Sequence, residues 1–261
     1  MKIESLLRTA IAHIVFGLKE RRFRSRLKYI YERKHRDMLV IVFPAFPSGD
    51  KPLYNYYRTV REVDCDKLFL LDDFGYRGSY LMYEGGQSTP EELVSGLLTS
   101  ILSKYNYKRV ITAGSSKGGT CAVYYGLLVG ADAVYAGACQ YYIGSYLNSV
   151  EHRRVLEGMM GQGAGEEEVE VLDRKLYDLI SRSRGSKTLI HLFYSKQEHT
   201  YQEHICPLIR DLEASGVRCE EHIAEFTDHA MVGMFFGPFL KSELLKSHVN
   251  MADWSFRGGQ T

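Results

Sequence analysis

Residues 110–120 read Val110-Ile111-Thr112-Ala113-Gly114-Ser115-Ser116-Lys117-Gly118-Gly119-Thr120. An apolar segment runs directly into a turn rich in glycine and serine, and a stretch with helical periodicity follows it. Residues 114–118 have the G-x-S-x-G form of a nucleophile elbow, a sharp strand-to-helix turn that exposes a serine hydroxyl. The pattern makes Ser116 the candidate nucleophile. The alternative interpretation is an ordinary glycine-rich turn between a strand and a helix.

The composition is typical of a soluble globular protein, with 45% hydrophobic and 25% charged residues in a chain of 261. A net charge of +1 gives no overall attraction to nucleic acid, so no nucleic-acid partner is expected. The five cysteines are odd in number and lack C-x-x-C spacing. We therefore expect reduced thiols, no metal site and a cytoplasmic protein.

Strand-like and helix-like segments alternate along most of the chain. This pattern predicts an α/β fold with a mostly parallel central sheet and helices on both faces. The expected strands are 25–32, 38–43, 67–71, 109–113, 133–138, 188–194 and 217–224, and the expected helices are 52–63, 90–104, 120–129 and 201–215. The second helix is marked most clearly, because Thr89 can cap it, Pro90 suits its first position and Glu92 completes a capping box.

Two regions stand outside this alternation. Residues 1–24 have helical apolar spacing up to residue 18 and then a run of arginines, which predicts an amphipathic basic helix. This helix can lie on the inner membrane face or pack on its own domain, residues 25–261. Residues 145–184 predict a small helical cap inserted into that domain. Its Met-Gly-rich centre, residues 159–165, fits either an adaptable acceptor site or a mobile connector.

A serine nucleophile needs a base and an acid that orients the base. In a fold of this type they follow the serine in the order acid, then histidine. Glu198 follows a strand candidate, and His229 follows the last one, so we assign them as acid and base. Asp228 adjoins His229 and is expected to cap the following helix.

An oxyanion hole requires two backbone N–H groups near the nucleophile. Lys117 supplies one of them as the residue after the serine. The turn Phe43-Pro44-Ala45-Phe46-Pro47 follows an early strand at the place where the second is needed, and Phe46 is the expected donor, because Pro44 has no N–H. The alternative is a turn that is merely stiffened by proline.

These motifs resemble bacterial polysaccharide O-acetyltransferases of the α/β-hydrolase fold, most closely the capsule enzymes of the meningococcal serogroup A kind. The resemblance rests on the turn at 43–47, on Arg77-Gly78-Ser79-Tyr80, on the tract from 114 to 119, and on Glu198 with Asp228-His229, and it covers roughly residues 26–245. More distantly the chain is similar to the acetyltransferase-like component of accessory Sec systems. The sequence departs from the family in having Glu198 where aspartate is expected, and in its N-terminal helix.

The resemblance implies acetyl transfer from acetyl-CoA to a polysaccharide hydroxyl through an acetyl-serine, with no bound cofactor. It makes Arg77, Tyr80 and Ser115 candidates for substrate or CoA binding; for Arg77, a structural salt bridge is the alternative. Two other functions remain open, a serine esterase acting on small acyl esters and a non-catalytic interaction protein of an envelope or secretion assembly. The sequence also leaves a homo-oligomer open.

Overall fold

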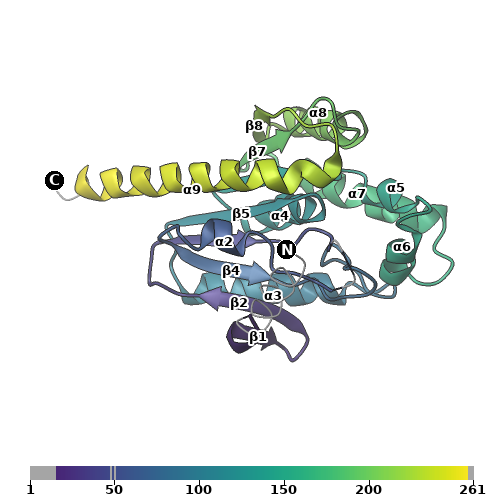
Figure 1. Ribbon diagram of the computed structural model, residues 1–261, viewed down its shortest axis with the longest axis horizontal. Helices are drawn as coiled ribbons and strands as arrows, with labels where there is room; N and C mark the ends of the chain where they lie inside the picture. The colour runs from purple at the N-terminus through teal and green to yellow at the C-terminus, as the bar shows by residue number, and fades with distance from the viewer. Residues whose placement is uncertain (1–15, 48, 50, 258–261) are drawn as a thin grey trace, which may run out of the picture.

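The structure of the protein is a computed structural model that describes residues 16–47, 49 and 51–257 (Figure 1). Within these residues an eight-stranded sheet has the spatial order β1-β2-β4-β3-β5-β6-β7-β8. β2 pairs antiparallel with both β1 and β4, and the remaining pairs are parallel. The strands are β1 (Glu20–Phe23), β2 (Leu27–Glu32), β3 (Met38–Val42), β4 (Asp66–Leu70), β5 (Arg109–Ser115), β6 (Ala133–Gly137), β7 (Leu189–Tyr194) and β8 (Arg218–Ile223).

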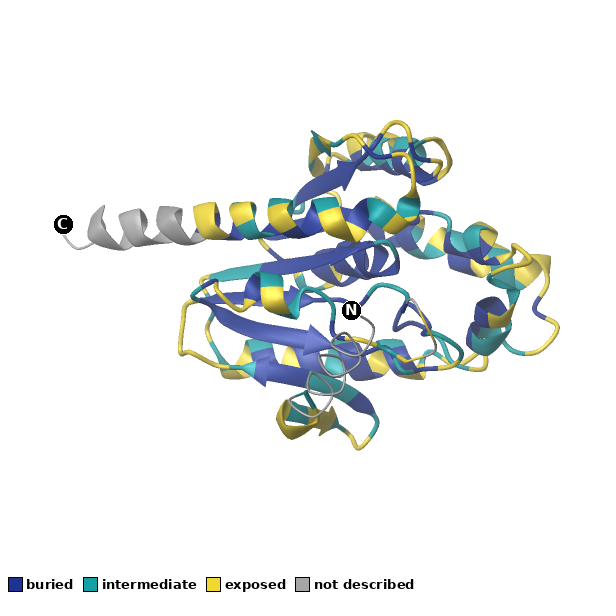
Figure 2. Ribbon diagram, viewed as in Figure 1, coloured by how far each residue is buried: buried dark blue, intermediate teal, exposed yellow. Residues whose placement is uncertain are grey.

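Helices cover both faces of the sheet. Alternate residues of β3 illustrate this, because Leu39 and Ile41 join the core beneath α3, α4, α7 and α8, whereas Val40 and Val42 join the core beneath α2 and α9. The central strands are accordingly buried on both sides (Figure 2). The helical segments are α2 (Tyr57–Val60), α3 (Thr89–Lys104), α4 (Lys117–Val129), α5 (Ile143–Leu147), α6 (Arg153–Met160), α7 (Glu166–Arg182), η1 (Tyr201–Ile205), α8 (Cys206–Ser215), η2 (His229–Met231) and α9 (Val232–Arg257).

The basic segment near the N-terminus forms a strand where the sequence predicted the end of a helix. Residues 16–19 are helical, but Glu20–Phe23 forms β1 and pairs with β2. Arg24 and Ser25 in the connecting turn are both left-handed, with φ of 46° and 62°, as a tight hairpin requires. Residues 1–15 of the expected helix lie outside the described residues, and the membrane contact expected of that helix and its arginines stays a prediction. No helix in the described part of the chain is long and apolar enough to cross a membrane.

Two helix starts also differ from expectation. The helix predicted at 52–63 is reduced to α2, because Tyr56 directly before it is left-handed, with φ of 56°, and cannot continue a helix. In α3 the N-cap is Ser88, and Thr89 is the first helical residue. The predicted capping box at Thr89 is therefore wrong, and the Ser88 hydroxyl donates instead to the Glu92 side chain, at Oε1 over 2.8 Å.

Only part of residues 145–184 forms the predicted cap, because α7 belongs to the core of the domain. α7 contacts α4 and α8, and its Leu172, Leu176, Leu179 and Ile180 are buried in the same core as the sheet. It is thus the helix that connects β6 to β7 across one face. Met159 of the Met-Gly-rich stretch is also fully buried at the end of α6. The glycines that follow it, residues 161–165, form the connection into α7.

Candidate active site

Ser116 lies at the sharp turn between β5 and α4. Its φ of 52° and ψ of −128° are adopted by a non-glycine residue only where the surrounding structure imposes them. A Cβ atom on Gly114 would lie 2.2 Å from the Gly118 carbonyl oxygen, and one on Gly118 would lie 2.5 Å from that of Phe43. The two glycines therefore allow the strands and the helix to pack closely around the serine.

Three loops at the carboxyl ends of parallel strands bring Ser116, His229 and Glu198 together. His229 Nε2 lies 2.8 Å from Ser116 Oγ, and His229 Nδ1 lies 3.1 Å from Glu198 Oε1. The serine follows β5, the glutamate follows β7 and the histidine follows β8. Residues separated by 113 positions in the chain are thus joined by one chain of hydrogen bonds.

The surroundings of Glu198 keep it ionised. Burial would raise the pKa of its carboxyl, but hydrogen bonds from His229 and Thr200 outweigh burial and hold that pKa below its ordinary value. His199 Nδ1 lies 2.8 Å from the same carboxylate oxygen that faces His229. An ionised carboxylate only accepts hydrogen bonds, so it favours the proton on His229 Nδ1 and leaves Nε2 free to accept from Ser116.

Asp228 holds the backbone that presents His229. Its Oδ1 accepts a hydrogen bond from the Ala230 amide over 2.9 Å and caps the short helical turn η2. The predicted capping role of Asp228 is therefore confirmed. It also explains why Glu198, and not the adjacent aspartate, faces the imidazole.

Gln140 is a fourth polar residue at this centre. From a fully buried position just after β6, its Nε2 donates to Ser116 Oγ over 3.2 Å, and it lies 3.5 Å from His229 Nε2. The amide is oriented by the Tyr80 hydroxyl, which donates to Gln140 Oε1 over 3.3 Å. The backbone of Gln140 is tied separately, because its N–H donates to Thr120 Oγ1 and its carbonyl accepts from the same hydroxyl.

The turn after β3 lies against the elbow. Its Ala45 amide is occupied, donating to Asn55 Oδ1 over 3.1 Å. The next amide in the turn is that of Phe46, whose ring lies 5.5 Å from Lys117 Nζ. Lys117 is the first residue of α4, a position whose N–H has no acceptor within the helix. Both predicted oxyanion donors therefore come from segments beside Ser116.

The Lys117 side chain makes a contact that the motif does not predict. It is 1% exposed and forms an ion pair with the equally buried Asp72, which follows β4. Asp72 Oδ2 also accepts from the Ser79 amide over 2.8 Å. A Cβ on Gly78 would lie 2.8 Å from both Asp72 Oδ2 and Lys117 Nζ, so a glycine is needed at this point. The pair fastens the loop after β4 to the elbow.

Arg77 lies in this loop at the side of the candidate site. Its Nη2 donates to the Pro47 carbonyl over 2.8 Å, and its guanidinium lies 5.9 Å from the centre of the Phe46 ring. Among the described residues no carboxylate forms an ion pair with Arg77. The structure therefore does not supply the salt bridge that was the alternative for this residue.

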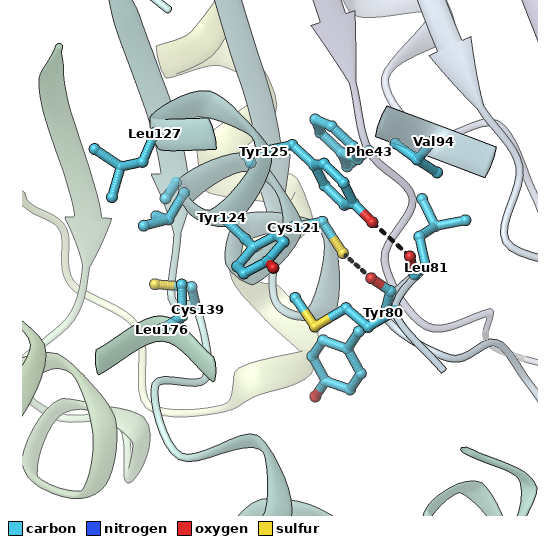
Figure 3. Packing of buried hydrophobic residues seen from close by; sticks show 14 of the residues in the cluster. Phe43, Tyr80, Leu81, Val94, Cys121, Tyr124, Tyr125, Leu127, Cys139 and Leu176 are labelled. Carbon is cyan, nitrogen blue, oxygen red and sulfur yellow. Dashed lines mark hydrogen bonds between the residues drawn. The ribbon is translucent and has the colours of Figure 1, made fainter. Parts of the chain in front are cut away.

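Tyr80 and Ser115, the other candidates for ligand contact, are enclosed. Tyr80 is fully buried, and its carbonyl accepts from Cys121 of α4 over 3.1 Å (Figure 3). Ser115 is 3% exposed, and its hydroxyl lies 2.5 Å from that of Tyr56. Their burial argues against direct contact with a substrate. Ligand contact by these two residues stays a prediction, and the contact that the structure shows at the candidate site is the hydrogen bond from Tyr80 to Gln140.

The sheet order and the elbow at the end of a central strand define the α/β-hydrolase fold, as predicted. Serine hydrolases of this fold are among the matching solved structures. A Staphylococcus aureus fluorophosphonate-binding serine hydrolase matches with a TM-score of 0.59 and 12% identity over 84% of this chain and 91% of that chain. A ferulic acid esterase matches with a TM-score of 0.56 and 13% identity over 87% and 95%.

The predicted resemblance to capsule O-acetyltransferases is also confirmed in structure. The enzyme of Neisseria meningitidis serogroup A matches with a TM-score of 0.71 and 20% identity over 84% of this chain and 90% of that chain. A histidine-to-alanine mutant of that enzyme in complex with CoA matches with a TM-score of 0.68 and 19% identity, covering 84% and 91%. No protein-family model and no curated protein sequence matches the chain. At these identities the likeness establishes the fold, and the chemistry must be argued from the site.

Proposed function

We propose that the protein is an O-acetyltransferase that moves acetyl from acetyl-CoA to a hydroxyl of a bacterial capsular or surface polysaccharide through an acetyl-serine intermediate. The observation that carries the proposal is the hydrogen-bonded chain from Ser116 through His229 to Glu198. A serine hydroxyl becomes an effective nucleophile when a base accepts its proton and an acid stabilises the charged base.

In the first half of the reaction Ser116 Oγ attacks the thioester carbonyl carbon of acetyl-CoA, and its proton passes to His229 Nε2. The negative oxygen of the tetrahedral intermediate accepts hydrogen bonds from the Phe46 and Lys117 amides. When the carbon–sulfur bond breaks, the departing thiolate takes the proton from His229. CoA leaves, and the acetyl group remains on Ser116 as an ester.

In the second half an acceptor hydroxyl attacks the acetyl-serine. His229 takes the proton of that hydroxyl and returns it to Ser116 Oγ as the ester bond to the enzyme breaks. Glu198 holds the imidazole in place and stabilises its positive charge in both halves. The products are the acetylated glycan and the regenerated serine.

The donor and acceptor classes are supported by the structural comparisons, since one similar structure is a capsule O-acetyltransferase in complex with CoA. Arg77 is evidence for an anionic ligand such as CoA. Its guanidinium has no carboxylate partner in the described residues and can therefore bind a phosphate. The α5–α6 segment supports the exclusion of water, since His152 packs on Phe46 beside the site and Tyr146 packs on His152.

Incubation with acetyl-CoA and a panel of surface polysaccharides tests the proposal, with acetylated glycan and free acetate scored separately. Acetylated glycan that requires Ser116 is the expected result. A second candidate, a serine esterase on small acyl esters, is favoured by the match to a ferulic acid esterase and shares the same three residues. Rapid hydrolysis of simple esters with no turnover of acetyl-CoA would assign the protein to that class. Absence of both activities would favour a non-catalytic role.

A further inference from the structure

A second cluster of polar side chains lies on the sheet itself, at β7 and the edge strand β8. His191 of β7 is paired in register with Glu220 of β8, and His222 lies two residues further along β8. Residues two apart on a strand share a face, so Glu220 and His222 project on the same side of the sheet. This is the side covered by α9, because Phe239 of that helix lies 4.6 Å from the His222 ring.

The three side chains converge on one point. His191 Nδ1 lies 3.0 Å from His222 Nε2 and 3.3 Å from Glu220 Oε2, and one ligand atom from each residue lies within 4.8 Å of the other two. Two ring nitrogens at 3.0 Å require either a shared proton or a shared cation. A tetrahedral Zn²⁺ with bonds of about 2.0–2.1 Å separates its ligand atoms by roughly 3.3 Å. The two separations from His191 Nδ1, 3.0 and 3.3 Å, lie at or slightly below that value.

We propose that His191, Glu220 and His222 form a binding site for a divalent transition-metal ion, with Zn²⁺ as the preferred ion. Two imidazoles and one carboxylate suit Zn²⁺, whereas Mg²⁺ and Ca²⁺ prefer ligands that are all oxygen. The Glu220 side chain is 57% exposed, which gives the ion a path from solvent and leaves room for water as a fourth ligand. No cysteine takes part, so the cysteine spacing on which we based the expectation of no metal does not bear on this site.

The histidine rings are held in place without the ion. Tyr135 stacks on His191 with ring centres 4.5 Å apart and planes 10° apart, and Phe239 packs on His222. A ligand that is already fixed loses little conformational entropy when it binds a metal. Only the exposed Glu220 has to be ordered.

An ion bound between β7 and β8 should stabilise this edge of the sheet. β7 leads into the loop that carries Glu198, and β8 leads into the loop that carries His229. An ion held by one residue of β7 and two of β8 would link the edge strand to its neighbour. Because it binds the folded protein and not the unfolded chain, it should raise the midpoint of thermal unfolding.

Equilibrium dialysis of the full chain against Zn²⁺ tests this proposal. We expect one ion per chain, an affinity at least tenfold lower in Glu220→Gln and in His222→Gln, and no change in Glu213→Gln, which alters an exposed carboxylate on α8. Co²⁺ provides a second readout, because binding to the two histidines should give visible absorption bands that His222→Gln removes. Zn²⁺ should also raise the unfolding midpoint of the wild type but not of His222→Gln.

Circular dichroism separates loss of folding from loss of the ligand, and Glu220→Gln lies on the surface, where it cannot disturb the core. Failure of the wild type to bind Zn²⁺ more tightly than Glu220→Gln would overturn the proposal. Equal binding by all four proteins would place the ion elsewhere and overturn it as well. Neither outcome bears on acetyl transfer, which depends on Ser116.

Discussion

Gln140 Nε2 donates a hydrogen bond to Ser116 Oγ over 3.2 Å. An oxygen that accepts from Gln140 on one side directs its own proton elsewhere, and the acceptor in reach is His229 Nε2 at 2.8 Å. Gln140 is therefore a positioning residue for the serine hydroxyl. It selects the rotamer in which the proton already points at the base.

Replacing Gln140 by Met keeps the volume of the side chain but removes the amide. We expect kcat/KM for CoA release to fall roughly 10- to 100-fold, as the loss of a buried hydrogen bond of about 1–3 kcal/mol predicts. The backbone bonds between Gln140 and Thr120 survive the change, so the fold should persist. Gln140→Glu is the matched control, because it retains the shape of the side chain while it replaces the amide. Wild-type rates in Gln140→Met would remove Gln140 from the proposed mechanism.

Ser116→Ala and His229→Ala should each reduce acyl transfer to near the background rate. Residues that act as a unit lose their joint contribution when either is removed, so the double variant should be little slower than either single one. Steady-state rates of CoA release from the three variants check this. Losses that multiply in the double variant would show that the two residues act separately. Glu198→Gln should be milder, because the amide can still orient the ring but carries no charge.

The ion pair between Lys117 and Asp72 should be costly to break on one side. Lys117→Met leaves the Asp72 carboxylate buried without its partner, and about 3–5 kcal/mol of unfolding free energy should be lost. The double change Asp72→Leu with Lys117→Met should recover part of that loss, because it removes both charges. Urea unfolding measures all three proteins. A single variant as stable as the wild type would mean that the pair contributes nothing to holding the elbow.

The buried imidazole of His204 should make the stability of the protein depend on pH. Burial lowers the pKa of its imidazole to about 4, whereas a histidine in an unfolded chain titrates near 6.5. As the pH falls from about 6.5 to about 4, the imidazole binds a proton in the unfolded chain but not in the folded protein. The free energy of unfolding is therefore highest above about pH 6.5 and decreases toward pH 4, by at most about 3 kcal/mol.

His204→Asn should flatten the stability profile between pH 6.5 and 4. The asparagine oxygen can still accept the Tyr142 amide hydrogen bond that His204 Nδ1 accepts over 3.3 Å. Urea unfolding at several pH values measures the slope, and His35→Asn, at an exposed position, is the control. A slope as steep in His204→Asn as in the wild type would locate the titrating group elsewhere.

The sequence predicts the parts of this site that depend on short motifs and on chain order. Ser116 lies in a pattern whose glycines have a steric purpose, and Glu198 and His229 each follow a strand that could be recognised from its apolar residues. Gln140 and Asp72 carry no such signal. Each follows a strand as many polar residues do, and only the three-dimensional structure brings their side chains to the elbow from 24 and 45 residues away.

The errors in the fold have local causes. β1 was missed because its arginines continue the polar face of the preceding helical pattern, and its pairing depends on a turn with two left-handed residues that are not glycine. The helix at 52–63 was overestimated because Tyr56 is left-handed, a conformation for which tyrosine gives no signal. The sequence places α7 in the cap because residues 145–184 interrupt the alternation of strands and helices, although the buried leucines of α7 share a face typical of a helix packed on the sheet.

The last prediction separates a transferase from an esterase. A transferase must keep water from its acetyl-serine until the acceptor arrives. The structure offers a cover in the α5–α6 segment, where Tyr146 lies between His152 and His204, with ring centres 4.6 Å and 5.8 Å away. Burial raises the pKa of the Tyr146 phenol to about 12, with Glu198 near enough to contribute. Tyr146 reaches the turn that carries Phe46 through His152, whose ring centre lies 6.0 Å from that of Phe46.

Mixing the protein with acetyl-CoA alone should release one equivalent of CoA in a burst, followed by slow release of acetate. The intact mass should rise by one acetyl group, except in Ser116→Ala, and the acceptor glycan should accelerate CoA release. Tyr146→Ala should increase acetate release without acceptor by roughly tenfold, since water then reaches the ester. Tyr177→Ala, on the exposed side of α7, is the control and should match the wild type. Acetate release that is already fast in the wild type, and unchanged in Tyr146→Ala, would favour the esterase.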